Sequence, residues 1–270
     1  MNSPGIRVSV ISPLPYLEMF TARRPPAVHH VAAHHVLQSD RYREFFREQQ
    51  HSGAEIVLDN GVFELGYSLP MSELTNAARL VGAGEIILPD VRRRRVETVE
   101  LVKRTLDELD GKPDVRLCAV VQGQDMVDWL TCYEQLHAMP QVESIALPAT
   151  RKHSDSPDIA LNRELATAYL AEHGLIDPAR RYRLLGLGYR GHLELAEQRR
   201  FGWIDSVDCA TPVILGALGV EMLENGPFEK ISTPRVETFE YIPPDRHELI
   251  RRNIDVLRRA AGDCDAEGSR

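Results

Sequence analysis

The sequence predicts a (β/α)8 barrel formed by a single domain. A chain of 270 residues with 43% hydrophobic content suffices for one large core. Eight short runs rich in Val, Ile and Leu lack polar alternation, which is typical of parallel strands buried on both faces. Helical patterns lie between most of these runs and no linker interrupts them, so residues 1–270 are assigned to one domain.

The predicted strands span residues 7–12, 28–33, 55–59, 85–90, 115–122, 144–149, 182–187 and 204–209. The clearest helical patterns cover residues 39–50, 71–81, 96–109, 126–139, 157–173 and 192–200. Gly82 and Gly84 mark one helix-to-strand turn, and the glycine–proline segments 111–113 and 174–178 mark two more.

Two regions depart from the repeating pattern. Residues 12–27 contain four prolines and only a short helix candidate at 16–21, which predicts an irregular loop or lid. After the eighth strand, residues 221–244 have an extended character. Residues 245–261 form a charged amphipathic pattern, which predicts a helix packed on the barrel, and residues 262–270 are expected to fray.

Composition narrows the function classes. The net charge of −8 disfavours nonspecific wrapping of nucleic acid, which depends on Lys and Arg neutralising phosphates. The four cysteines are scattered without a C-x-x-C pair, so neither a disulfide framework nor a cysteine zinc site is predicted. The chain lacks a signal-like start and an apolar stretch long enough for a membrane, so we expect a cytoplasmic protein without a membrane partner.

Polar side chains end four of the predicted strands. Asp59, Asp90, Gln122 and Asp208 each follow an apolar strand core. In a (β/α)8 barrel the carboxyl ends of the strands meet at one face, where active sites lie, so these residues are expected to share one site. A single carboxylate in such a place can equally cap the next helix or pair with an arginine, and the combination of four favours a site.

The same residues carry a family resemblance. Asp59-Asn-Gly-Val-Phe63 resembles the Asp-Ser-Gly-Gly-Phe signature of the tRNA-guanine transglycosylases, and Val121-Gln-Gly123 resembles their Val-Gln-Gly. Leu185-Gly-Leu-Gly188 is similar to their Met-Gly-Val-Gly, and Asp208-Cys-Ala-Thr-Pro212 to the Asp-Cys-x-x-Pro after their nucleophile strand. The order and rough spacing of these motifs agree over about residues 55–212.

The resemblance implies exchange of guanine in a nucleotide for a 7-deazaguanine, without a metal or redox cofactor. Asp208 would attack C1′, expel guanine and hold a covalent glycosyl-enzyme intermediate, which the incoming base then displaces. Asp59 would act as general acid and base at the purine nitrogen. Asp90 would accept hydrogen bonds from guanine N1–H and the 2-amino group, and Gln122 would donate one to O6.

Further substrate contacts are expected from the same motifs. These positions are Asn60, Phe63, Ala149, Leu185 and Gly186. Two residues depart from the family signature, since Asn60 stands where the family has Ser and Val62 where it has Gly. Pro148 lies where the family has a glycine-rich backbone contact to the base, and proline has no N–H to donate.

DNA is the expected polymer. The closely spaced cysteines and following histidine that form the zinc module of the tRNA-modifying members have no counterpart here, and the chain is shorter than those members. This reduced form is similar to phage and bacterial relatives that insert 7-deazaguanine derivatives into DNA, which would place it in the host cytoplasm if it is phage-encoded. The partners implied are DNA and a free 7-deazaguanine, with tRNA as the alternative and a homodimer left open.

Basic and aromatic residues near the predicted mouth are candidates for nucleic-acid contacts. They are Arg92, Arg93, Arg94, Arg151, Lys152, His35 and Tyr189. Arginines there can hold phosphates, although a solvated helix start or ion pairs with neighbours such as Glu97 would explain them equally well. Tyr189 can stack on a base or pack at the rim, and His35 can touch a phosphate or sugar or pack as an ordinary polar residue.

Two other function classes stay open. The run His29-His-Val-Ala-Ala-His-His35 is the main argument for a metal-dependent barrel hydrolase, although strand alternation would send His30 and His34 to the face opposite His29 and His35. A noncatalytic nucleic-acid-binding barrel is the other class. The set of four polar strand ends argues against it, because binding alone does not require a nucleophile.

Overall fold

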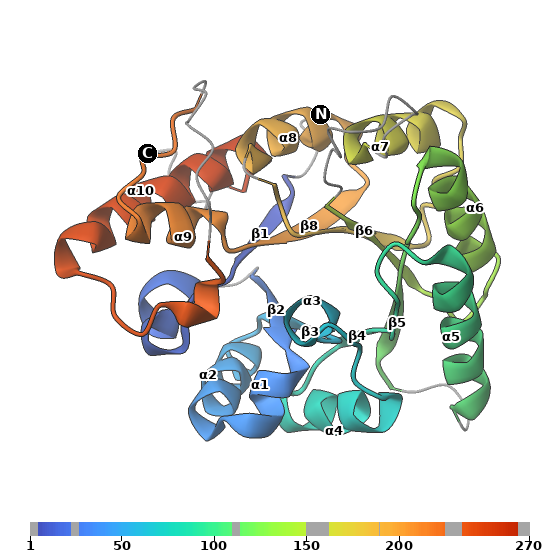
Figure 1. Ribbon diagram of the computed structural model, residues 1–270, viewed down its shortest axis with the longest axis horizontal. Coiled ribbons are helices and arrows are strands. Elements are labelled where there is room, and N and C mark those ends of the chain that lie inside the picture. Colours follow the sequence, from blue (N-terminus) through green and yellow to red (C-terminus); the bar gives the residue numbers. More distant parts are fainter. Residues whose placement is uncertain are drawn as a thin grey trace.

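Eight parallel strands form a nearly closed barrel in the computed structural model, which confirms the predicted fold class (Figure 1). The structure describes residues 5–22, 27–109, 114–149, 162–188, 190–224 and 234–263. The strands are β1 (Arg7–Val10), β2 (Val28–Ala32), β3 (Glu55–Asp59), β4 (Glu85–Ile87), β5 (Arg116–Val120), β6 (Ser144–Pro148), β7 (Arg181–Leu185) and β8 (Ile204–Cys209). They follow one another in the order β1-β8-β7-β6-β5-β4-β3-β2.

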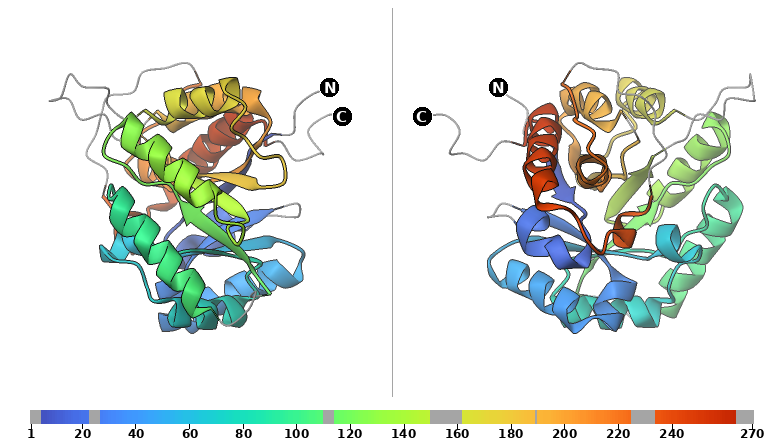
Figure 2. Two further views of the ribbon diagram at one scale, coloured as in Figure 1. Left: turned by 90° about the vertical axis from the view of Figure 1, so that its right-hand side faces the viewer. Right: turned by 60° about the vertical axis from the view of Figure 1, so that its left-hand side comes forward.

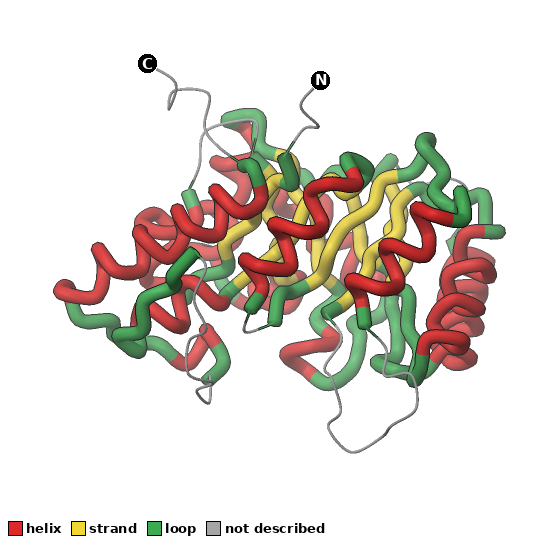
Figure 3. Tube along the Cα trace, turned by 90° about the horizontal axis from the view of Figure 1, so that it is seen from above, coloured by secondary structure: helices red, strands yellow, loops and turns green. Residues whose placement is uncertain are grey.

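Helices surround the strands on the outside (Figures 2 and 3). The helices are α1 (Ala33–Gln38), α2 (Asp40–His51), α3 (Val62–Leu65), α4 (Met71–Val81), α5 (Arg95–Glu108), α6 (Met126–His137), α7 (Arg163–Glu172), α8 (Gly191–Gln198), α9 (Thr211–Ala217) and α10 (Pro244–Ala261). Short 3-10 or π turns are η1 (Leu14–Tyr16), η2 (Leu17–Thr21), η3 (Arg199–Phe201) and η4 (Val236–Thr238). The predicted C-terminal helix is therefore present, and the irregular first unit consists of η1 and η2.

Local sequence signals explain several boundaries. Ser39 precedes α2, and its hydroxyl accepts a hydrogen bond from the Tyr42 backbone N–H at 3.2 Å, as an N-cap does. Helix α4 ends at Gly82, whose φ of 66° places it in the left-handed region that glycine favours. The helix predicted over residues 157–173 corresponds to α7, which begins at Arg163, and residues 157–161 lie outside the described residues. The other predicted helices and strands that the structure describes agree to within a few residues at each end.

The histidine run does not form one strand. Strand β2 ends at Ala32, and helix α1 begins at the next residue, so His34 and His35 lie on a helix. The prediction that strand alternation sorts the four histidines onto two faces is therefore wrong for this pair. Apolar character continued past the true strand end, and such a run fits a helix start as well as a strand.

The apolar core has an outer and an inner part. Outward strand residues such as Val8, Leu117 and Leu184 pack against the surrounding helices. Inside the barrel a smaller cluster contains Val28, Val57, Ile87, Cys118, Val120 and Ala146. The inner cluster fills the side of the barrel formed by β2 to β6. Polar residues lie at both ends of the same strands, as Glu55 and Asp59 do on β3, and they form the charged network at one end and the candidate site at the other.

The barrel closes between β1 and β2 through a side chain. The Ser9 hydroxyl of β1 accepts a hydrogen bond from the His30 backbone N–H of β2 at 2.9 Å. Helix α10 also holds β1, because the Ile6 N–H donates to the Ala261 carbonyl and the Val8 N–H donates to Asp263 Oδ2, each at 2.9 Å. Asp263, the second residue of the predicted frayed tail, thus contacts β1. Residues 264–270 lie outside the described residues.

Candidate functional site

The four polar residues predicted to share a site lie at one end of the barrel. Asp59 is the last residue of β3, and Asp208 is the second-last residue of β8. Asp90 and Gln122 lie on the loops that follow β4 and β5. The charge of Asp59 contributes to raising the pKa of both Asp90 and Asp208, so the carboxylates interact with one another. The structure therefore brings all four together.

Asp208 is held on one oxygen and open on one side. Its Oδ1 accepts a hydrogen bond from the Gly186 backbone N–H at 2.8 Å, and His30 Nδ1 lies 3.8 Å from the same oxygen. The side chain is 24% exposed, so part of the carboxylate faces the mouth. Burial, with the charge of Asp59, raises the pKa of Asp208 to about 6, while the Gly186 N–H opposes the rise. The carboxylate form still predominates at pH 7.

Arg163 stabilises the loop after β7, whose Gly186 N–H holds Asp208. Its buried guanidinium pairs with Glu194 at 2.6 Å and donates to the carbonyls of Leu147, Leu185 and Gly186 at 2.9, 3.1 and 3.0 Å. The cation thereby ties the ends of β6 and β7 to the start of α7. The fixed Gly186 N–H can then point at Asp208.

Three predicted substrate contacts serve this loop in the structure. The Ala149 N–H donates to the Leu185 carbonyl at 2.8 Å, and the Gly186 N–H is bound to Asp208. These backbone groups therefore bind one another and Arg163 rather than facing the mouth. Sequence motifs located the segments but could not tell a backbone group that binds substrate from one that positions a side chain.

Asp59 ends its strand in a turn that requires glycine. The Gly61 N–H donates to Asp59 Oδ1 at 2.8 Å, and Gly61 itself has a φ of 81°. Asn60 accepts from the Val62 N–H at 3.0 Å, which starts helix α3 over the mouth. Burial raises the pKa of Asp59, and the Gly61 hydrogen bond only partly opposes it. Asp59 thus keeps its proton more readily than an ordinary aspartate.

Two amides hold the carboxylate of Asp90. Asn60 Nδ2 donates to Oδ1 and Gln122 Nε2 donates to Oδ2, both at 2.7 Å. The Ser68 hydroxyl bonds to the Asp90 backbone, accepting from its N–H at 3.0 Å and donating to its carbonyl at 2.8 Å. Burial raises the pKa of Asp90 to about 6 although both amides favour its charged form. Asn60, predicted to contact substrate, therefore orients Asp90.

Gln122 joins Asp90 to the basic loop, which consists of residues 92–94. Its Oε1 accepts from the Arg93 backbone N–H at 2.8 Å, so both ends of the Gln122 amide are engaged. Arg93 is a non-glycine residue with a φ of 60°, a conformation that costs free energy and needs such support. The basic loop is thereby built onto the same hydrogen-bonded unit as Asp90.

The basic loop is exposed beside an aromatic ring. Arg92, Arg93 and Arg94 are all exposed, and the Arg92 guanidinium lies 5.1 Å from the centre of the Phe63 ring. Phe63 is itself 53% exposed. Arg94 lies 3.5 Å from Glu97 in an exposed ion pair, so Glu97 of α5 partly neutralises its charge.

The other predicted nucleic-acid contacts are not all visible. Arg151, Lys152 and Tyr189 lie outside the described residues. His35 is half-buried on α1, with its ring centre 4.1 Å from that of His34 and 5.2 Å from that of Tyr42. These ring contacts match the ordinary packing that was the alternative for His35.

Sequence reasoning missed Glu64, which lies one residue beyond the motif that ends at Phe63. Its Oε2 is buried and has no hydrogen-bond partner among the described residues. Burial, followed by the charge of Asp59, raises the pKa of Glu64 to about 8. Glu64 is therefore mostly protonated at neutral pH. Its position directly after the Asp59 motif was the signal that could have identified it.

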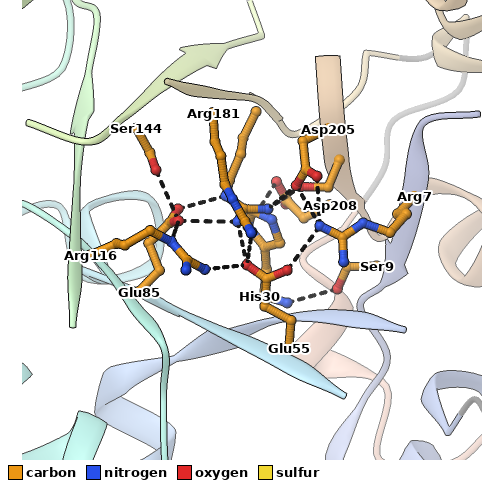
Figure 4. Close-up of polar contacts among 12 residues, drawn as sticks. Arg7, Ser9, His30, Glu55, Glu85, Arg116, Ser144, Arg181, Asp205 and Asp208 are labelled. Carbon is orange, nitrogen blue, oxygen red and sulfur yellow. Dashed lines mark hydrogen bonds and ion pairs between the residues drawn. The ribbon is translucent and has the colours of Figure 1, made fainter. Parts of the chain in front are cut away.

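A charged network fills the amino end of the barrel below the site (Figure 4). Arg183 is fully buried and lies 2.6 Å from Glu85, 2.7 Å from Glu55 and 2.8 Å from Asp205. Arg7, Arg116, Arg181, Ser144 and Ser206 complete the network. Burial alone would raise the pKa of Glu55, but the charges of Arg183 and Arg7 lower it to about 2.

In the part of the chain that the structure describes, no three His, Cys, Asp or Glu side chains are arranged to hold a metal ion. No helix among the described residues is long and apolar enough to cross a membrane.

Comparison with known proteins identifies the fold and no closer relationship. No protein-family model and no curated protein matches the chain. Among solved structures, the YdjI aldolase from Escherichia coli K12 aligns with a TM-score of 0.53 and 12% identity, over 97% of this chain and 90% of the aldolase. A D-allulose 3-epimerase from Methylomonas sp. aligns with a TM-score of 0.49 and 9% identity, over 96% of this chain and 99% of the epimerase. Neither is a transglycosylase, and similarity at this level concerns the barrel alone.

Proposed function

We propose that this protein is a glycosyltransferase that exchanges guanine in DNA for a 7-deazaguanine through a covalent bond between Asp208 and C1′. The observation that carries the proposal is the pair of half-buried carboxyl groups, Asp59 and Asp208, at the mouth of one barrel. Burial raises the pKa of each, yet Asp208 is mostly ionised at pH 7, with a pKa of about 6. Double displacement at a sugar carbon needs one carboxylate that attacks and one carboxyl group that can donate a proton, and the raised pKa of Asp59 favours the second role.

In the first half-reaction Asp208 Oδ2 attacks C1′ of the nucleotide. The C1′–N9 bond breaks, and its electron pair leaves with guanine. Protonated Asp59 donates its proton to the departing purine, so guanine leaves as a neutral base and Asp59 becomes a carboxylate. Asp208 is now an ester of C1′, and its Oδ1 stays bound to the Gly186 N–H.

The second half-reaction reverses these roles. The incoming 7-deazaguanine loses the N9 proton to the Asp59 carboxylate, and N9 attacks C1′. The bond between Asp208 and C1′ breaks, which restores the Asp208 carboxylate and the protonated form of Asp59. Two displacements retain the configuration at C1′. The exchange therefore consumes neither a net proton nor an external energy source.

Asp90 is the residue proposed to recognise the guanine base. Asn60 and Gln122 orient the two oxygens of Asp90, and each oxygen has a second lone pair for a guanine N1–H or 2-amino group. An adenine offers no such pair of donors on that edge. Binding adenine would leave a buried carboxylate without partners, which costs more than a simple loss of contact.

Exposed cations and an aromatic ring at the same mouth support a polymeric substrate. Arg92 and Arg93 can contact phosphates, and the Phe63 ring offers a stacking surface for a neighbouring base. A base inside a duplex must be flipped out to reach Asp208. We favour DNA over tRNA because the sequence lacks the zinc module of the tRNA-modifying transglycosylases that it resembles.

The test is release of labelled guanine. The protein is incubated with a 7-deazaguanine such as the cyano form and with duplex DNA, single-stranded DNA or a tRNA transcript, each carrying labelled guanine. Asp208→Asn is the test variant, and Asp107→Asn is the matched control because Asp107 is exposed on α5. Denaturing gels of a reaction without incoming base detect a covalent complex with the polymer.

Release from DNA by the wild type and the control, but not by Asp208→Asn, supports the proposal. Release from tRNA alone moves the assignment to the same chemistry on RNA. Release from neither polymer, or undiminished release by Asp208→Asn, refutes the proposed reaction.

A further inference from the structure

His30 is an anomaly in the interior of the barrel. It lies in the middle of β2 with its side chain only 3% exposed. Neither ring nitrogen has a hydrogen-bond partner among the described residues. A buried polar group without a hydrogen-bond partner destabilises the fold, because it has lost its bonds to water and gained none in return. The backbone N–H of His30 donates to the Ser9 hydroxyl, which fixes the point from which the side chain extends.

The ring faces one carboxylate. His30 Nδ1 lies 3.8 Å from Asp208 Oδ1, beyond hydrogen-bond distance but within reach of a small shift (Figure 4). The carboxylates of Glu55, Glu85 and Asp205 in the network below are bound by arginines. Asp208 instead receives the Gly186 N–H on this oxygen. His30 Nδ1, which has no hydrogen-bond partner among the described residues, therefore faces Asp208 Oδ1.

The surroundings keep His30 neutral. Burial, followed by the charge of Arg183, lowers the pKa of His30 to about 3, and Glu55 opposes this only partly. A neutral imidazole carries one N–H and one lone pair. As a neutral donor it can orient a carboxylate without cancelling its charge, whereas an imidazolium would form an ion pair and weaken the nucleophile.

We propose that His30 is a positioning residue for Asp208, and that its Nδ1–H donates a hydrogen bond to Oδ1 when the carboxylate is ionised. This inference rests on the proposed function for its catalytic meaning. With Gly186 and His30 both on Oδ1, the lone pairs of Oδ2 are left for the bond to C1′. In the ester, Oδ1 becomes the carbonyl oxygen and keeps both donors. When the ester breaks, the same donors stabilise the returning negative charge.

The test must separate this role from simple packing. His30→Asn places an amide N–H near the position of Nδ1, and His30→Gln places it near Nε2, so the two variants share their chemistry and differ in donor position. His30→Phe removes both nitrogens and keeps a ring. If His30→Phe does not fold, the comparison of Asn with Gln decides.

The first readout does not depend on turnover. The side-chain carboxyl of Asp208 is titrated by NMR in the full chain labelled with ¹³C-aspartate, and Asp208→Asn assigns its signal. Asp59, Glu64 and Arg163 also act on this carboxyl, whereas Arg183, Arg7, Glu55 and His29 surround His30. All of them are unchanged in these variants.

Loss of the donor is expected to raise the pKa of Asp208 by about one in His30→Phe and His30→Gln, because a hydrogen bond donated to the carboxylate favours its charged form. His30→Asn is expected to stay near the wild-type value. Equal pKa values in all variants, or a shift in His30→Asn as large as in His30→Gln, would overturn the inference.

The second readout is the exchange reaction. His30→Gln is expected to lower kcat at least tenfold with KM little changed, and His30→Asn to restore most of it. If the wild type exchanges no base on any polymer, the proposed function fails while the NMR titration still decides whether His30 donates to Asp208. An unchanged kcat in all His30 variants of an active enzyme would overturn the positioning role.

Discussion

Replacing Glu55 with Gln should reveal how strongly the charged network stabilises the barrel. Glu55 begins β3 and lies within 3 Å of four guanidinium groups, those of Arg7, Arg116, Arg181 and Arg183. Glutamine keeps the shape and a hydrogen-bond acceptor but removes the negative charge. The substitution therefore leaves four cations around a neutral group in the amino end of the barrel.

The magnitude follows from the pKa of Glu55, which is about 2 in the folded protein against an ordinary value of 4.5. Each pKa unit corresponds to about 1.4 kcal/mol, so ionised Glu55 stabilises the fold by about 3 kcal/mol at pH 7. The folded pKa is depressed, so this stabilisation is complete above pH 4.5. It is lost progressively as the pH falls from there towards 2.

Urea unfolding of the wild type and Glu55→Gln between pH 3 and 7 measures the effect. The difference in the free energy of unfolding should be about 3 kcal/mol at pH 7 and should shrink below pH 4.5. Glu100→Gln, at an exposed position on α5, is the control and should change stability by less than about 0.5 kcal/mol. A difference below about 1 kcal/mol, or one that does not vary with pH, would refute the reasoning.

Three further predictions concern the proposed site. Below pH 6, kcat/KM should fall at least tenfold per pH unit, because Asp208 and Asp90 must both be ionised and each has a pKa of about 6; a flat acid profile would contradict these roles. Asp90→Asn should reduce the preference for guanine over adenine at least tenfold in competition assays while the circular dichroism spectrum stays native, and unfolding would instead make Asp90 structural. Arg92→Ala should lower the dependence of log Kd on log salt by about one for DNA, measured by fluorescence anisotropy, whereas Phe63→Ala should weaken binding without changing that slope. If the slope of log Kd against log salt is unchanged in Arg92→Ala, the DNA does not contact Arg92.

The barrel could be predicted because its strands are buried on both faces. Runs such as residues 55–59 and 204–209 have enough Val, Ile and Leu to be recognised without any knowledge of their neighbours. The boundary between β2 and α1 could not be located in the same way, because Val31, Ala32 and Ala33 suit either element.

From the sequence, only the site residues that follow a predicted strand could be identified. Asp59 and Asp208 follow apolar cores, and the barrel geometry then requires them to be neighbours. Arg163 could not be found, since its role depends on reaching three carbonyl groups on other elements. Arg183 was missed for a similar reason. A charge inside a strand is normally taken to face solvent, and two of its carboxylate partners, Glu85 and Glu55, lie about 100 or more residues away along the chain.

The way β1 is held also bears on how the protein is made. Strand β1 pairs with β8 and is hydrogen-bonded to the last turn of α10 and to Asp263. Its backbone link to β2 runs through the Ser9 hydroxyl, which accepts the His30 N–H. Strand β1 therefore acquires most of its partners only after β8 and α10 have been synthesised. These contacts join residues far apart in the sequence, and such contacts form slowly because a long loop must close first.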